Sequence, residues 1–173
     1  MSSVVIVSIA RTPIAKFCGS FQNFKASELG SLAIKGALAK LNDYGGGSGD
    51  SGNESGLVIQ EAIMGNVVSA GMGQAPCRQA VLGAGLPEST ICTTINKVCA
   101  SGMKSIMMAS QSIAFQGNGT YLAGGFESMS NIPHYLTNSR TGTVLGHGKV
   151  LDGVIHDGLW DVYNDQHMVT LLL

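Results

Sequence analysis

Cys99 is the residue whose type and position most directly indicate chemistry. It stands in I-N-K-V-C-A-S-G-M-K-S, residues 95–105, between a short apolar run and a segment with helical spacing. In parallel α/β sheets, ligands bind where strands end and helices begin, and the free N–H groups of a helix start favour the nucleophilic thiolate. The same N–H groups can bind the oxyanion formed when a thioester carbonyl is attacked. The position is compatible with a nucleophile, but on position alone a packed core thiol is the more common role of such a cysteine.

The segments around Cys99 predict an α/β fold with a mostly parallel sheet. Continuous apolar, β-branched runs predict four strands, at residues 4–9, 58–64, 91–95 and 120–123. Apolar residues at helical spacing predict three helices, one after an N-cap at Ser27, one at 74–82 and one at 99–115. The alternation of strands and helices predicts that helices cover the faces of the sheet. Cys99 then lies where the third strand ends.

Two other segments have compositions that predict irregular structure. Residues 44–56 are rich in Gly and Ser, which is typical of a flexible surface loop. From Glu127 onward Gly, Asn, Thr and Asp dominate and no clear element is predicted. For Glu127 itself we expect a structural polar role. A boundary near residue 128 divides the chain into a sheet-forming part, 1–128, and a second part, 129–173.

Composition narrows the class of protein. The chain has 173 residues, a net charge of −1 and only 12 % charged residues, which gives no basic patch for nucleic acid. No apolar run approaches the roughly 20 residues of a membrane span. The four cysteines lack C-x-x-C spacing, which disfavours zinc and predicts reduced thiols, with Cys18, Cys77 and Cys92 packed. The N-terminal residues lack the features of a signal or transit peptide, so a cytoplasmic protein is the default expectation.

Several motifs in order resemble the thiolase family, and within it the acetoacetyl-CoA thiolases (acetyl-CoA C-acetyltransferases). They are A-R-T-P-I-A-K-F-x-G-S-F (10–21), G-N-V-V-S-A-G-M-G-Q-A-P-x-R-Q-A (65–80), N-K-V-C-A-S-G-M-K (96–104), A-G-G-F-E-S-M-S-N (123–131) and D-G-L-W-D-V-Y-N-D-Q-H-M (157–168). The resemblance implies the N-terminal half of a layered αβαβα thiolase fold. Residues 1–128 would form a half-domain with an incomplete sheet, and 129–173 the beginning of the CoA-binding loop domain.

The resemblance also implies a reaction and its site residues. Cys99 would attack an acyl-CoA and carry the acyl group as a thioester, with its own N–H contributing to an oxyanion hole. A second acetyl-CoA would condense with that group to give acetoacetyl-CoA, and the reaction is reversible. Leu159, His167 and Met168 fall where the family contacts CoA. Acetyl-CoA, acetoacetyl-CoA and CoA are substrates or products, no separate cofactor or metal is implied, and the full-length family forms homo-oligomers.

The family's chains are more than twice as long as this sequence. The asparagine of N-E-A-F-A, the histidine of G-H-P and a second cysteine in C-x-G lie in a part that residues 1–173 do not contain, so this chain is expected to be inactive alone. Three interpretations remain open at this point. The chain is a piece of an acetoacetyl-CoA thiolase, a non-catalytic product that pairs with full-length thiolase subunits, or a ketosynthase-type relative. The motif around Cys99 is typical of thiolases, which disfavours the interpretation as a ketosynthase-type relative.

Overall fold

The computed structural model describes residues 3–45, 58–142 and 144–172. Its centre is a sheet of three parallel strands in the order β2-β1-β3. The strands are β1 (Ile59–Gly65), β2 (Ile91–Ile95) and β3 (Thr120–Gly125). Each lies within two residues of its predicted bounds, so the α/β fold with a parallel sheet is confirmed. The loop predicted at 44–56 lies almost wholly outside the described residues.

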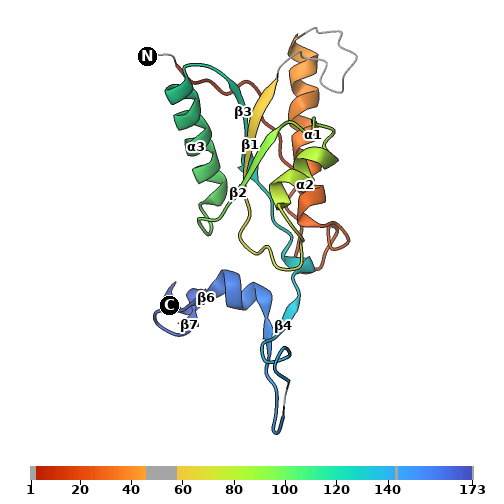
Figure 1. Cartoon of the computed structure of the whole chain (residues 1–173), viewed down its shortest axis with the longest axis vertical. Helices are drawn as coiled ribbons and strands as arrows, with labels where there is room; N and C mark the ends of the chain where they lie inside the picture. The colour runs from red at the N-terminus through yellow and green to blue at the C-terminus, as the bar shows by residue number, and fades with distance from the viewer. Residues whose placement is uncertain (1–2, 46–57, 143, 173) are drawn as a thin grey trace.

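Helices cover both faces of this sheet (Figure 1). α1 (Ala26–Gly45) and α2 (Pro76–Gly83) pack against each other on one face, and α3 (Ser101–Gln116) lies against the other. The main core fills the space under α1 and α2, where Ile34, Met64, Val81 and Phe126 are buried. α3 buries only the small side chains Ser101, Ser105 and Ala109, which lets this helix approach the sheet closely.

α1 begins at Ala26, two residues earlier than an N-cap at Ser27 predicts. Its first turn is capped by Glu28, whose carboxylate Oε2 accepts a hydrogen bond of 2.7 Å from the Lys25 N–H. Ser27, the predicted N-cap, is instead a buried helical residue, and its hydroxyl donates to Gln79 Oε1 at 3.2 Å. The prediction for Ser27 is wrong because contact with α2 uses its hydroxyl.

The predicted first strand at residues 4–9 does not form. The segment is tied to α1 instead: the Ser8 hydroxyl donates to the Ala37 carbonyl at 2.7 Å, and Lys40 Nζ donates to the Ile9 carbonyl at 2.9 Å. Ile6 and Ile9 are 74 % and 71 % exposed, so the run is not buried on either face. A β-branched run predicts extended backbone, but a strand also needs an adjacent strand with which to pair.

The part after Glu127 contains short elements that no periodicity reveals. A 3₁₀ turn (Met129–Asn131) precedes β4 (His134–Leu136), which pairs antiparallel with β5 (Val150–Asp152). A π-helical turn, η2 (Ile155–Leu159), leads to the hairpin β6 (Trp160–Asp161) and β7 (Gln166–His167), then to η3 (Met168–Leu172). The expectation of no clear element is therefore wrong in part, since pairs of two or three residues are too short to show a period. Among the described helices, none combines the length and apolar character needed to cross a membrane.

The sheet domain exposes apolar surface along α3 and along residues 4–9. On α3, Met103 and Phe115 are 68 % and 92 % exposed, and Ile106 and Met107 are each about half exposed. In the described part of the chain, no strand pairs with the outer edge of β3. Open edges and contiguous apolar patches both drive association.

We therefore expect residues 1–173, expressed alone, to self-associate at micromolar concentration. The double change Met103→Glu and Met107→Lys places a favourable charge pair on the exposed face of α3 and should shift the population toward smaller species. Sedimentation velocity measures both proteins at matched concentrations. A wild-type chain that is a monodisperse, cooperatively unfolding monomer would contradict the expectation.

Candidate active site

The carboxyl ends of the three strands lie level and form one edge of the sheet. Gly65 is paired with Ile95 of β2 and with Gly125 of β3, and the Asn66 and Phe126 N–H groups continue the hydrogen bonding at 3.0 Å. The segments that leave the strands thus start side by side. In parallel sheets this edge is where ligands bind.

Cys99 lies at this edge, in the turn that joins β2 to α3. Its side chain is exposed, and α3 begins two residues later at Ser101, so Cys99 precedes the helix. The first helical hydrogen bond of α3, from the Lys104 N–H to the Ala100 carbonyl, is 2.8 Å long. An exposed thiol at this position is accessible to an electrophile, and the interpretation of Cys99 as a packed core thiol is wrong for this structure.

The other cysteines have different environments. Cys77, in the first turn of α2, is fully buried, and burial, as the largest cause, raises the pKa of its thiol to about 12. Cys92 is half-buried in β2, which agrees with its predicted packing role. Cys18, predicted to be packed, is exposed in the N-terminal loop, where its N–H donates to the Ser130 hydroxyl at 2.9 Å. Exposure alone therefore does not distinguish Cys99 from Cys18; location at the strand ends does.

Glu127 joins the segments that leave β1 and β3. Its Oε1 accepts from Asn66 Nδ2 at 2.9 Å and from the Val68 N–H at 3.1 Å, while Oε2 accepts from the Val67 N–H at 2.9 Å. Burial raises the pKa of this carboxyl, and the three hydrogen bonds offset part of that effect. These contacts give Glu127 the structural role predicted for it.

Leu159, His167 and Met168 are gathered around one hairpin. Leu159 ends η2 directly before Trp160, and Trp160 pairs with His167, which is followed by Met168. Figure 1 shows this segment beyond the carboxyl ends of the strands, on the side where α3 begins. Gly158 packs on Val68, because a Cβ there would lie 3.1 Å from Val68 Cγ2. The described contacts bring these residues together but do not join them to Cys99.

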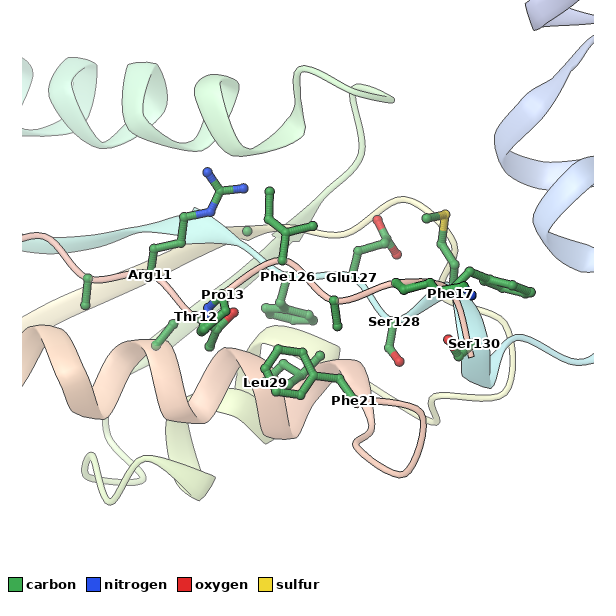
Figure 2. A pocket seen from close by; sticks show the side chains of 17 residues that line it. Arg11, Thr12, Pro13, Phe17, Phe21, Leu29, Phe126, Glu127, Ser128 and Ser130 are labelled. Atoms are coloured by element: carbon green, nitrogen blue, oxygen red, sulfur yellow. The ribbon is translucent and has the colours of Figure 1, made fainter. Parts of the chain in front are cut away.

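A cavity of about 370 Å³ lies beside this edge and was not predicted from sequence. It is lined by the N-terminal loop 10–17, by α1 and by the chain that leaves β3. Figure 2 shows Phe126 pointing toward α1, whereas Arg11 and Glu127 point the other way. Neither Cys99 nor the hairpin residues line this cavity. Within the described ranges, no three metal-ligating side chains come together.

Comparison with known proteins identifies the relatives of this chain. The family model described as "Thiolase, N-terminal domain" matches residues 4–171. The chain is 52 % identical over 162 residues to acetyl-CoA acetyltransferase 2 of Arabidopsis thaliana, covering 94 % of this chain and 38 % of the relative. It is 53 % identical over 168 residues to mitochondrial acetyl-CoA acetyltransferase of Homo sapiens, covering 97 % and 36 %.

A solved structure agrees with this relationship. The Acat5 thiolase of Ascaris suum, crystallised with coenzyme A, superposes with a TM-score of 0.79 at 37 % identity, covering 94 % of this chain and 39 % of that one. The chain thus spans little more than a third of the length of the relatives it matches. The expected fold, the N-terminal part of a thiolase, is confirmed.

The same comparison corrects the expected compartment. Relatives from Bos taurus and Homo sapiens, matched along 97 % of this chain, are named mitochondrial. The expectation of a cytoplasmic protein is therefore overturned. That expectation rested on the first residues lacking the features of a signal or transit peptide, and this observation does not assign a compartment.

The raised pKa of Glu127 predicts how stability depends on pH. A carboxyl whose pKa is raised on folding stabilises the folded state most below its unfolded value, here 4.5, and loses that contribution as pH rises through the folded pKa. The free energy of unfolding of the wild type, relative to Glu127→Gln, should therefore fall as pH rises from 4.5 toward neutrality. Urea denaturation followed by circular dichroism measures the difference, with Glu88→Gln at an exposed site as the matched control. A difference that grows with pH would contradict this assignment.

Proposed function

The chain belongs to the thiolase family, and on that premise we propose that it is the nucleophile-bearing N-terminal part of an acetyl-CoA acetyltransferase. Its substrates are acetyl-CoA and acetoacetyl-CoA, and Cys99 is the acyl carrier. The observation that carries the proposal is the exposed Cys99 thiol at the strand edge, in a chain 52 % identical to an acetyl-CoA acetyltransferase along 94 % of its length.

The first half of the reaction uses Cys99 directly. The Cys99 thiolate attacks the carbonyl carbon of acetyl-CoA, and the carbonyl oxygen takes the negative charge of the tetrahedral intermediate. The Cys99 N–H contributes a hydrogen bond to that oxygen. The carbon–sulfur bond to CoA then breaks, CoA leaves as a thiol after accepting a proton, and the acetyl group stays on Cys99 as a thioester.

The second half forms or breaks a carbon–carbon bond. A second acetyl-CoA loses a methyl proton to a base, its carbanion attacks the acetyl group on Cys99, and acetoacetyl-CoA leaves with regeneration of the thiolate. In reverse, CoA cleaves acetoacetyl-CoA. The family resemblance assigns the proton transfers to the histidine and second cysteine of the C-terminal part, which residues 1–173 do not contain.

The hairpin residues are proposed to contact coenzyme A. Leu159 and Met168 offer apolar surface to the pantetheine arm, and His167 offers a ring nitrogen. His167 Nδ1 accepts from the Val169 N–H at 3.2 Å, which leaves Nε2 for a ligand. Residues 1–128 would then be the half-domain that carries the nucleophile, and 129–173 the beginning of the CoA-binding loop domain. Coenzyme A bound in the Ascaris suum thiolase supports a CoA ligand for this fold.

One observation favours a second candidate function. The exposed apolar surface of α3 and of residues 4–9 suits contact with another protein, as in a non-catalytic chain that pairs with full-length thiolase subunits. Size-exclusion chromatography of the chain mixed with a full-length thiolase tests this function. Co-elution supports pairing, and separate elution contradicts it.

We expect residues 1–173 alone to show no useful turnover of acetoacetyl-CoA with CoA. Each missing proton-transfer group is worth roughly 10²–10⁴ in rate, although such losses are not additive. Cys99 should still acquire an acetyl group from acetyl-CoA slowly, detected by peptide mass spectrometry. The adduct should vanish in Cys99→Ser and persist in Cys18→Ser, which removes the other exposed thiol.

Two results would contradict the proposal. Robust turnover by residues 1–173 would mean that the proton-transfer groups lie within this chain. An acetyl group spread equally over the cysteines, or retained in full by Cys99→Ser, would remove Cys99 as the acyl carrier.

A further inference from the structure

The residue before Cys99 has a strained backbone. Val98 has φ +49°, in the left-handed region. For a β-branched residue this conformation is a genuine outlier, because its Cβ branches crowd the backbone. Such conformations persist only where surrounding contacts hold them. The turn that presents Cys99 therefore needs groups that keep Val98 in place.

Two polar side chains supply these contacts together with the backbone N–H of Ser101, which donates to the Val98 carbonyl at 3.0 Å. The Ser101 hydroxyl donates to the Val98 carbonyl at 2.6 Å and accepts from the Lys97 N–H at 2.8 Å, so it bridges the carbonyl of Val98 and the amide of the residue before it. Asn96 Oδ1 accepts from the Val98 N–H at 2.8 Å. Ser101 is 4 % exposed, so water does not readily replace its hydroxyl. Together these contacts bind both the N–H and the carbonyl of Val98.

The position of Ser101 is itself fixed by the sheet. A Cβ built on Gly65 would lie 2.6 Å from Ser101 Cβ, so the end of β1 touches the first residue of α3. Ser101 therefore cannot move toward the sheet, and its hydroxyl has a defined direction. Ser105, one turn further along α3, is also buried, but its hydroxyl donates to the carbonyls of Gly102 and Gly124 and not to the turn.

We propose that Ser101 is a positioning residue that holds Val98 in the left-handed conformation and thereby sets the direction of the Cys99 thiol at the strand edge. Asn96 assists from the other side of the turn. The significance of this role rests on the proposed function of Cys99. Without the Ser101 hydroxyl, Val98 relaxes toward an ordinary conformation, and Cys99 turns away from the start of α3.

The test uses three thiols of the same chain. Cys99 reports the turn, Cys18 is an exposed thiol outside it, and the buried Cys77 reports unfolding. Residues 1–173 react with iodoacetamide at neutral pH, and peptide mass spectrometry gives the rate constant at each thiol. Ser101→Ala should lower the Cys99 rate relative to Cys18 by up to about fivefold, which is the change in the conformational equilibrium expected from loss of one buried hydrogen bond. Ser105→Ala, the matched change on α3, should leave that ratio unchanged.

A second change distinguishes positioning from a general structural effect. Glycine adopts the left-handed conformation without strain, so Val98→Gly should restore the Cys99 rate in the Ser101→Ala background. If Ser101→Ala unfolds the chain and thereby exposes Cys77, Asn96→Ala replaces it as the test variant. Asn96 is an exposed residue, so this change should lower the Cys99 rate while Cys77 stays protected. An unchanged Cys99 ratio in a folded variant, or no restoration by Val98→Gly, overturns the proposal. A wild-type Cys99 that reacts no faster than Cys18 instead counts against the proposed function, because iodoacetamide needs neither CoA nor a base from outside the chain.

Discussion

The close approach of α3 to the ends of β1 and β3 is the constraint on which the candidate site depends. Gly65, Gly102 and Gly125 meet here, and a Cβ built on Gly125 would lie 3.5 Å from the Gly102 Cα. Only glycines and the small Ser101 side chain separate the helix start from the strand ends, so α3 begins directly at the edge of the sheet. Cys99 is consequently held at the edge of the sheet and outside the helix.

The two faces of the sheet serve different purposes. The face under α1 and α2 holds the apolar core, which includes Phe126 and the buried Cys77. The face under α3 is lined by small residues and brings polar backbone groups together at the strand ends. Glu127 and Asn66 link the segments that follow β1 and β3 at that same edge. The contacts that stabilise the strand ends and the candidate nucleophile therefore lie at one edge of the sheet. The hairpin with His167 reaches this edge from the C-terminal part of the chain through the contact of Gly158 with Val68.

Sequence patterns predicted the elements whose environments are regular. β2 has its predicted bounds, and α2, predicted at 74–82, begins at Pro76 and ends at Gly83. The predicted strand at residues 4–9 is absent because a β-branched composition indicates extended backbone but does not indicate whether a partner strand is adjacent. Ser27 misled because tertiary contact with Gln79 competes with capping.

The candidate site was predictable only in part. The alternation of strands and helices predicted that Cys99 lies between a strand end and a helix start. Only the family motifs indicated Leu159, His167 and Met168. The strain at Val98 was hidden, because valine is among the residues least expected at positive φ, and so was the hydroxyl of Ser101 that opposes it. Such features follow from three-dimensional contacts between residues several positions apart, which residue type does not encode.

The reactivity of Cys99 in Gly65→Ala tests most directly whether the close approach of α3 to β1 positions the thiol. A Cβ there would lie 2.6 Å from the backbone of Ser101, so the start of α3 must shift, whereas Gly102→Ala meets its nearest atom at 3.9 Å and serves as the control. We predict that Gly65→Ala brings the iodoacetamide rate of Cys99 down to that of Cys18, with Cys77 still protected, and that Gly102→Ala does not. An unchanged Cys99 rate in a folded Gly65→Ala chain would contradict this prediction.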